Sequence, residues 1–239
     1  MKQKNNYSIR YIKDLCKNDY LCEEIRHSKK FRLTNKYWSE RGGHFNNTNK
    51  IGRMTQIFKS SKNPGDINCN INYYFSSGEG RSVQQLKEVA DEFRKYTLKN
   101  SDVYISEWDA WDFLIIRVFY ETQLGVDREL DTIKELGKKL PEGMQIQNEA
   151  FGISSTELDY KYAIDGICVN LGVPLFGIQI KSKWYKEAKG KIKDINKEKN
   201  EKFEDKYQIP VFYVYFNDGV LDWSSIKEFF TKLKGYSCE

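Results

Sequence analysis

Apolar positions recur with a helical period in the first part of the chain. Ile9, Ile12 and Leu15 are spaced as on one helix face, which predicts short amphipathic helices within residues 1–40. The same period over residues 82–99 and about 106–136 predicts two longer helices, and the second is rich enough in aromatic and β-branched residues to be buried. The N-terminal part is therefore expected to be mainly helical.

After residue 140 the pattern changes to short β-branched runs. The order of the elements predicts an α/β fold, in which helices flank a mixed central β-sheet on both faces. Ser224 is expected to cap the last helix. The expected strands lie over residues 144–150, around Asp165, up to Lys181 and over 209–216, and the expected helices over 184–206 and 224–234.

Residues 41–80 have a different texture, with glycine, asparagine and serine clusters that are typical of loops. The run INCNINYYF within them is interpreted as a strand or edge ribbon. Arg41 and Arg53 decorate this segment, and arginines on such loops can read guanine in a DNA groove. Solvated loops without a DNA contact are the alternative.

The charge is unevenly distributed along the chain. Residues 1–62 hold 15 lysines and arginines against 5 acidic residues, a balance of +10, and the remainder holds 24 against 29, a balance of −5. A basic front on an acidic body favours a polyanion contact beside a metal-collecting site, although a solvated lysine-rich surface gives the same numbers. We divide the chain into a basic, helical and loop-rich N-terminal region, 1–100, which is expected to contact the polyanion, and a core region, 101–239.

Composition argues against several classes of protein. No apolar run approaches the roughly 18 residues that span a bilayer, so we expect no membrane association. The polar first thirty residues argue against a secretory signal, and five cysteines without metal-ligand spacing favour reduced thiols in the cytoplasm. Two histidines leave little material for a zinc site or a Ser-His-Asp triad.

The candidate chemistry lies in residues 162–189, where two β-branched runs follow each other. Gln179 and Lys181 project from the same face of the second run, because strand side chains alternate. If the runs pair, Asp165 lies beside them, and a carboxylate, an amide and an ammonium group meet at one sheet edge. A buried carboxylate needs a cation partner, either Lys181 or a divalent metal. Strands that simply end in polar residues are the alternative.

The pattern ID…Q-x-K on consecutive strands resembles the PD-(D/E)XK nuclease superfamily, with glutamine in a position that is usually acidic. More narrowly, LDYKYAIDGI…GIQIK…Y…EAK, together with the upstream YETQL, is similar to the family of TaqI-like type II restriction endonucleases. The resemblance covers residues 115–190 or so. It implies a restriction-endonuclease-like core.

The resemblance also implies roles for individual residues. Because glutamine replaces an acid, the site has one negative charge fewer, which weakens Mg²⁺ binding unless another carboxylate contributes. The implied metal ligands are Asp165 as main ligand, the carbonyl of Ile180 as further ligand and Asp159 as possible second carboxylate, with Gln179 in the second acidic position. Lys181 would orient or help deprotonate the attacking water and stabilise the charge that develops on the phosphorane, and Glu121 would be an accessory acid.

The expected activity is Mg²⁺-dependent hydrolysis of double-stranded DNA at a short palindromic site, with TCGA as a guess, leaving 5′-phosphate and 3′-hydroxyl ends. Lys183 and Lys186 are candidates for holding the flanking phosphates, with a solvated lysine-rich helix face as the alternative. A palindrome implies a homodimer, and restriction implies a cognate DNA methyltransferase. A non-specific or repair nuclease of the same superfamily, or a catalytically inactive DNA-binding module, are the alternatives.

Overall fold

The computed structural model describes residues 7–40, 48–187, 191–217 and 220–233. The chain forms two compact units, Met1–Asp127 and Arg128–Glu239. The boundary falls inside helix α9 (Glu121–Gly137), whereas the sequence suggested a division at residue 100. The reason is that aromatic residues of the long buried helix pack into the core of the first unit.

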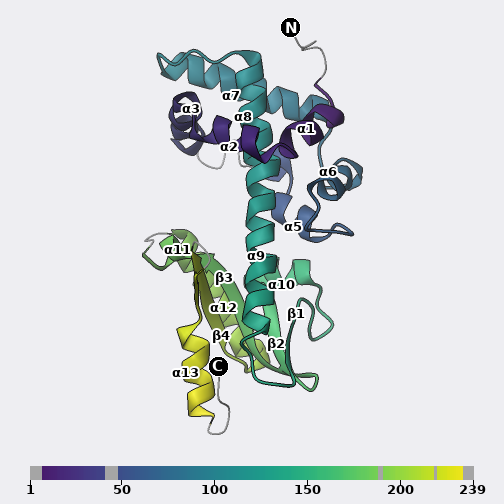
Figure 1. Cartoon of the computed structure of the whole chain (residues 1–239), viewed down its shortest axis with the longest axis vertical. Helices are drawn as coiled ribbons and strands as arrows, with labels where there is room; N and C mark the ends of the chain where they lie inside the picture. The colour runs from purple at the N-terminus through teal and green to yellow at the C-terminus, as the bar shows by residue number, and fades with distance from the viewer. Residues whose placement is uncertain (1–6, 41–47, 188–190, 218–219, 234–239) are drawn as a thin grey trace. The chain divides into compact units, whose positions relative to one another are not determined.

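The described part of the first unit is helical (Figure 1). The two long helices predicted after residue 80 are confirmed, and the second contains a π-helical turn, η2 (Ile116–Tyr120), between α8 and α9. The other helices are α1 (Ile9–Cys16), α2 (Asp19–His27), α3 (Lys29–Glu40), α4 (Thr48–Ile51), α5 (Met54–Lys59), α6 (Ile67–Ser76), α7 (Val83–Asn100) and α8 (Glu107–Ile115).

The run INCNINYYF is helix α6, and its interpretation as a strand was wrong. Asp66 caps this helix, since its carboxylate accepts hydrogen bonds from the backbone N–H groups of Asn68 and Cys69. Ile71 and Tyr74, three residues apart, are both buried. The cap and the buried face therefore outweigh the β-propensity of the isoleucines and tyrosines.

An aromatic cluster forms the core of the first unit. The ring of Phe93 lies 4.8 Å from that of Phe113 and 5.2 Å from that of Trp38. Phe31 reaches Phe113 from α3 at 4.6 Å between centroids. These contacts join α3, α7 and α8, and so place α8 in the first unit.

The second unit is built on a five-stranded mixed sheet in the order β1-β2-β3-β4-β5. Only the β3–β4 pair is parallel. This confirms the α/β class and the mixed sheet flanked by helices. The strands are β1 (Met144–Gln147), β2 (Gly166–Asn170), β3 (Val173–Ser182), β4 (Val211–Asn217) and β5 (Val220–Asp222).

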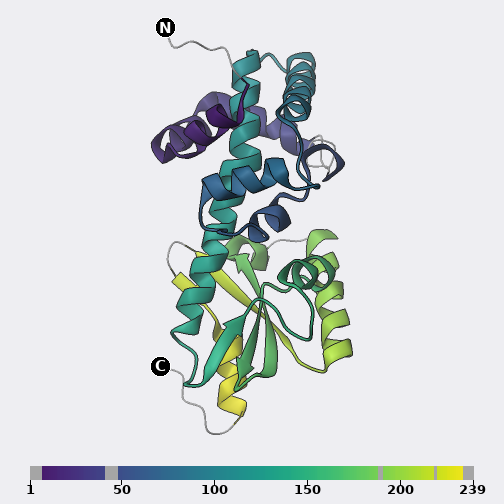
Figure 2. The ribbon, with the colours of Figure 1, turned by 90° about the vertical axis from the view of Figure 1, so that its right-hand side faces the viewer.

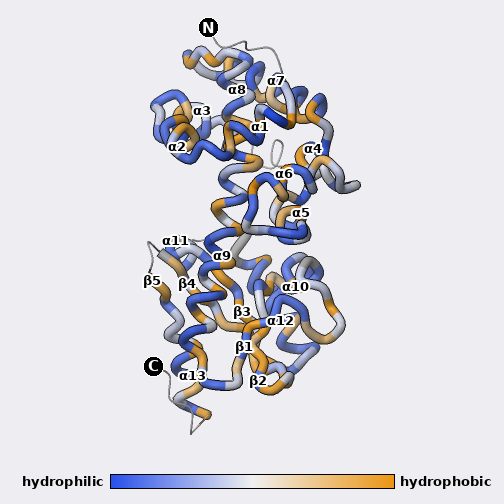
Figure 3. Tube along the Cα trace, turned by 45° about the vertical axis from the view of Figure 1, so that its right-hand side comes forward, coloured by the Kyte–Doolittle hydropathy of each residue, from blue (hydrophilic) through white to orange (hydrophobic). Residues whose placement is uncertain are grey.

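Helices cover both faces of this sheet, as Figure 2 shows. On one face Ile178 packs with Phe230 of α13 (Ser224–Lys232) and with Leu136 at the end of α9. On the other face Ile167 packs with Phe203 of α12 (Lys191–Tyr207) and with residues of α10 (Ser155–Tyr162). Burial on both faces explains why β2 and β3 are hydrophobic along most of their length (Figure 3).

Three of the differences between the second unit and the sequence prediction concern its helices. Helix α10 was not expected, although Ser154 accepts a hydrogen bond from the N–H of Glu157 in a recognisable helix start. The single helix expected over residues 184–206 is two helices, α11 (Lys183–Glu187) and α12. Ser224 is the first residue of α13 rather than its cap, and its N–H is bound by Asp222.

Among the helices of the described residues, none combines the length and the apolar character that a membrane crossing requires.

Candidate functional site

Asp165 lies immediately before β2, where α10 turns into the sheet. Ala163 ends α10 in the left-handed conformation, with φ 55°, and so redirects the chain toward the sheet. The backbone N–H of Asp165 then donates to the carbonyl of Ile178 at 2.8 Å, which extends the β2–β3 pairing by one residue. Asp165 is therefore fixed at the edge where β2 begins and β3 approaches its end.

The register of β3 decides which backbone groups face Asp165. The N–H of Gly177 bonds to Pro210 on the β4 side, whereas the carbonyl of Ile178 faces β2. The N–H of Ile180 donates to Oδ2 of Asp165 at 2.8 Å. Because the N–H and C=O of one strand residue point to the same side, the carbonyl of Ile180 is also directed toward the Asp165 side of β3.

Lys181 lies next to this carboxylate. Its Nζ is 4.0 Å from Oδ2 of Asp165, and the two side chains are 24% and 4% exposed. The Lys181 ammonium also lies 5.9 Å from the centre of the Tyr185 ring. A carboxylate that is nearly buried thus has an ammonium beside it and a backbone donor, which lowers the cost of its burial.

Gln179 projects from the same face of β3 as Lys181, but its amide is engaged elsewhere. The side chain is 1% exposed, and its Oε1 accepts a hydrogen bond from Nδ2 of Asn200 on α12 at 3.0 Å. Asn200 also donates to the hydroxyl of Tyr213 on β4 at 3.0 Å. Sequence reasoning missed Asn200, because it lies in a polar helix of Lys, Glu and Asn in which nothing marks it as buried.

Glu121 lies in the first unit, at the start of α9, and is held by two arginines. Its Oε1 accepts from Nε of Arg26 at 3.2 Å, and its other oxygen pairs with Arg117 one turn earlier. Arg26 in turn binds Glu23. Burial alone would raise the pKa of Glu23, but hydrogen bonds from Arg26 and Tyr120 outweigh burial and lower it. Glu121 is thus part of an ion network, and its accessory role stays a prediction.

The remaining predicted residues lie at different places. Asp159 is half-buried on α10, and its backbone carbonyl accepts from Ala163. Lys183 is exposed at the start of α11, and Nζ of Lys186 pairs with Asp222 at 3.2 Å. Arg53 is exposed before α5. Arg41 lies outside the described residues.

The oxygen donors at this edge suit a hard cation. Within the described ranges, no three His, Cys, Asp or Glu residues gather as a metal-binding group. The edge does offer the carboxylate of Asp165 and, on the same side of β3, the carbonyl of Ile180. Mg²⁺ binds through one or two such oxygens and keeps several of its waters, so this sparse donor set fits it.

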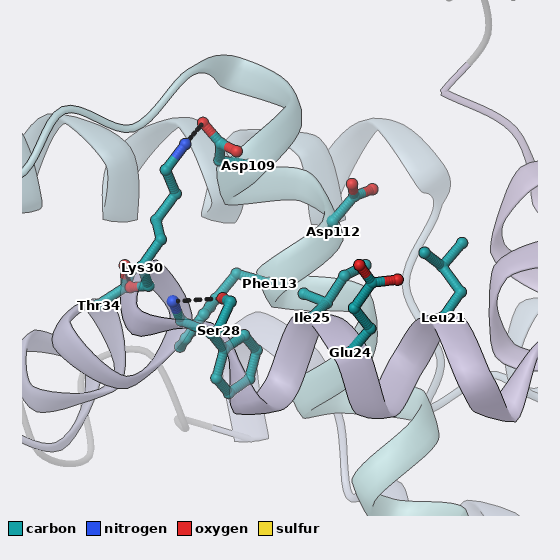
Figure 4. Close-up of a pocket in the computed structure, with 10 residues that line it drawn as sticks. Leu21, Glu24, Ile25, Ser28, Lys30, Thr34, Asp109, Asp112 and Phe113 are labelled. Carbon is teal, nitrogen blue, oxygen red and sulfur yellow. Dashed lines mark hydrogen bonds and ion pairs between the residues drawn. The ribbon is translucent and has the colours of Figure 1, made fainter.

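A pocket of about 250 Å³ lies in the first unit, between α2, α3 and α8 (Figure 4). Lys30 and Asp109 form an ion pair at its rim, with 3.0 Å between Nζ and Oδ2. The backbone N–H of Phe31 donates to Ser28. Its lining contains none of the residues predicted for catalysis.

Comparison with known proteins gave no relative: no family model, curated protein or solved structure matches this chain.

Proposed function

We propose that this protein is a Mg²⁺-dependent type II restriction endonuclease of the PD-(D/E)XK superfamily, with a restriction-endonuclease-like core in its second unit. The observation that carries the proposal is the convergence of Asp165, the backbone of Ile180 and Lys181 at one edge of the β2–β3 pair. The sequence motif alone required only that these residues be near in the chain. Their convergence in space is what phosphodiester chemistry needs.

The second unit's residues have distinct tasks in this proposal. Asp165 and the Ile180 carbonyl would hold Mg²⁺, which when bound supplies positive charge and a more acidic water. Lys181 binds a non-bridging phosphate oxygen and stabilises the negative charge that grows on it during in-line attack. The Lys181 side chain is 24% exposed, so its ammonium is open to a phosphate while most of the side chain is shielded from water.

The proposed substrate is double-stranded DNA with a short palindromic site. The basic N-terminal part supplies positive charge for phosphate contacts, with Lys183 as a further candidate at the sheet edge. Two copies related by a two-fold axis are the simplest way to cut both strands of a palindrome. We further propose a cytoplasmic protein with a cognate methyltransferase, because a restriction enzyme requires protection of the host DNA.

A catalytically inactive DNA-binding module is the second candidate, and one observation favours it. Asp165 has an ammonium group at 4.0 Å, so its charge is balanced before any metal arrives. Under this reading the Asp165–Lys181 pair stabilises the sheet edge and performs no chemistry. A nuclease without sequence preference is the third possibility, on the same site.

Incubation with supercoiled plasmid and Mg²⁺ separates these functions. Discrete fragments support restriction, and a smear supports a non-specific nuclease. A mobility shift without cleavage supports the binding module. The absence of both cleavage and a shift, across plasmids of differing sequence, would refute all three. An EDTA control reports whether cleavage depends on the metal.

A further inference from the structure

The side-chain amide of Gln179 has a fixed orientation. Its Oε1 accepts from Nδ2 of Asn200 at 3.0 Å, and the side chains are 1% and 5% exposed. This is the one side-chain hydrogen bond that Gln179 makes within the described residues. An amide that is buried and anchored at its oxygen does not exchange its two ends freely.

Asn200 imposes this orientation through its own bonds. Its amide nitrogen carries two hydrogens and donates both, one to Gln179 and one to the hydroxyl of Tyr213 at 3.0 Å. Its Oδ1 is buried and has no partner among the described residues. If the Asn200 amide were reversed, its nitrogen would take the buried position of Oδ1 and leave two N–H donors unpaired. Buried unpaired donors are rarer and cost more than an acceptor without a partner.

Tyr213 connects this network to Tyr185. Burial, followed by interactions with Tyr185, raises the pKa of Tyr213. The Tyr185 hydroxyl in turn accepts from Nδ2 of Asn196, one helical turn before Asn200. The chain of hydrogen bonds is thus anchored on α12 at both ends.

The consequence is that the nitrogen of the Gln179 amide, not its oxygen, is the end without a hydrogen-bond partner among the described residues. We propose that Gln179 donates a hydrogen bond to a phosphate oxygen, and that Asn200 is the positioning residue that presents this donor. The proposal deepens the proposed function, because Gln179 and Lys181 share one face of β3, roughly 7 Å apart along the strand. It replaces the metal-facing role that the family resemblance implied for Gln179.

Phosphate binding without metal tests the proposal directly. The side-chain N–H₂ signal of Gln179 is observed by NMR in the isotope-labelled full chain, and is assigned by its loss in Gln179→Glu. With divalent cations removed, inorganic phosphate should shift this signal in a saturable manner. A signal that phosphate leaves unmoved in the wild-type protein would overturn the proposal.

Two substitutions of Asn200 isolate its role. Asn200→Asp offers only acceptors when ionised and so turns the Gln179 nitrogen toward residue 200, while Asn200→Leu releases the amide without adding charge. Each should weaken the phosphate response about tenfold, the value of one hydrogen bond to a charged group. Asn196→Asp is the matched control, because it adds the same charge on α12 but contacts Tyr185. Wild-type responses in both Asn200 variants would refute the positioning role. Circular dichroism checks folding, and the wild-type titration decides alone if neither variant folds.

Cleavage assays keep this test separate from that of the function. Plasmid cleavage without a phosphate-induced shift would refute the donor role and leave the nuclease intact, whereas a shift without cleavage supports the donor and counts against the nuclease. Gln179→Glu should weaken DNA binding in EDTA and leave the half-saturating Mg²⁺ concentration unchanged. A markedly lower Mg²⁺ requirement in this variant would place the residue at the metal and overturn the proposal.

Discussion

Two carboxylates that sequence reasoning assigned to one chemistry have contrasting surroundings. Glu121, in the first unit (the helical unit), is bound by Arg26 and Arg117, and its side chain is 20% exposed. Asp165, in the second unit (the sheet unit), accepts a hydrogen bond from the backbone N–H of Ile180 and has Lys181 at 4.0 Å, and its side chain is 4% exposed. One carboxylate is held by planar guanidinium groups and the other by a backbone and an ammonium.

The difference indicates which carboxylate is suited to a reaction. Guanidinium groups fix a carboxylate in direct hydrogen bonds, so Glu121 would lose these if it moved toward a ligand. The 4.0 Å between Lys181 and Asp165 exceeds hydrogen-bond length, so the ammonium can turn to a phosphate without breaking one. Glu121 therefore resembles a structural ion pair, whereas Asp165 and Lys181 are the pair that we propose for the reaction.

Phe203→Ala tests most strongly whether the two units are separate in stability as well as in contacts. Phe203 is fully buried on α12, and a Cβ at Gly177 of β3 would lie 3.5 Å from its ring. Its removal should destabilise the sheet unit by about 3–5 kcal/mol. Hydrogen exchange should show lost protection in β3 and β4 but not in α7.

Phe93→Ala is the matched variant in the helical unit, since Phe93 is equally buried there. It should remove protection from α7 and α8 and leave β3 protected. If either variant loosened both units to the same extent, the chain would unfold as one cooperative body and the division would have no energetic meaning.

Asp165→Asn is the next largest test, and it addresses the site alone. The amide retains the shape of the side chain and an acceptor for the N–H of Ile180, but it removes the charge. Cleavage should fall at least about 100-fold, the scale seen when one electrostatic contact to the reacting group is lost. Asp222→Asn is the control, since Asp222 pairs with Lys186 in the same unit. Near-normal cleavage by folded Asp165→Asn would remove Asp165 from the site.

The sheet edge was predictable because its signals are local. β-branched runs gave β2 and β3, and the intervening turn contains Leu171 and Gly172 with φ of 49° and 83°. The antiparallel pairing that follows from a short turn brought Asp165 beside β3. Alternation then placed Gln179 and Lys181 on one face. Each of these inferences depended only on residues that are close in the chain, so the sequence was sufficient to make it.

The sequence predictions that failed concern features that depend on tertiary packing. Residues 67–76 carry strand-forming side chains, but the Asp66 cap and the buried Ile71 and Tyr74 favour a helix. Asn200 contacts Gln179 across 21 positions of sequence, and no pattern in its polar helix indicates which asparagine faces the sheet. Because sequence reasoning could not place Asn200, it could not predict the orientation of the Gln179 amide either. Ala163, in turn, adopts a left-handed conformation that is usually found at glycine.

Glu121→Gln sharpens the contrast between the two carboxylates. The neutral amide cannot balance Arg26 and Arg117, so the free energy of unfolding should fall by about 1–2 kcal/mol, less than a fully buried pair would lose. Urea titration measures this change. Cleavage should fall less than about tenfold if the carboxylate is only structural. A larger fall in a variant that remains folded would instead support the accessory catalytic role.

The smallest expected effect is on the stability of the helical unit at acid pH, and it is tested by substituting Asp109. Burial opposes the charged form of Asp109, but hydrogen bonds from Ser106 and Lys30 outweigh it and lower the pKa. The ionised Asp109 contributes fully to the free energy of unfolding above its unfolded-state pKa of about 3.9. This contribution is lost as the pH falls through its lower folded-state pKa.

Asp109→Asn should therefore reduce the loss of stability between about pH 6 and pH 3, by less than about 1 kcal/mol because the side chain is 31% exposed. Urea midpoints at the two pH values measure it, with the exposed Asp102→Asn as charge-matched control. If Asp109→Asn and wild type lose the same stability on acidification, the depressed pKa has no role in folding. The ion pairs of the helical unit would then resemble the solvated pairs of an ordinary surface, and the contrast with Asp165 would rest on Glu121 alone.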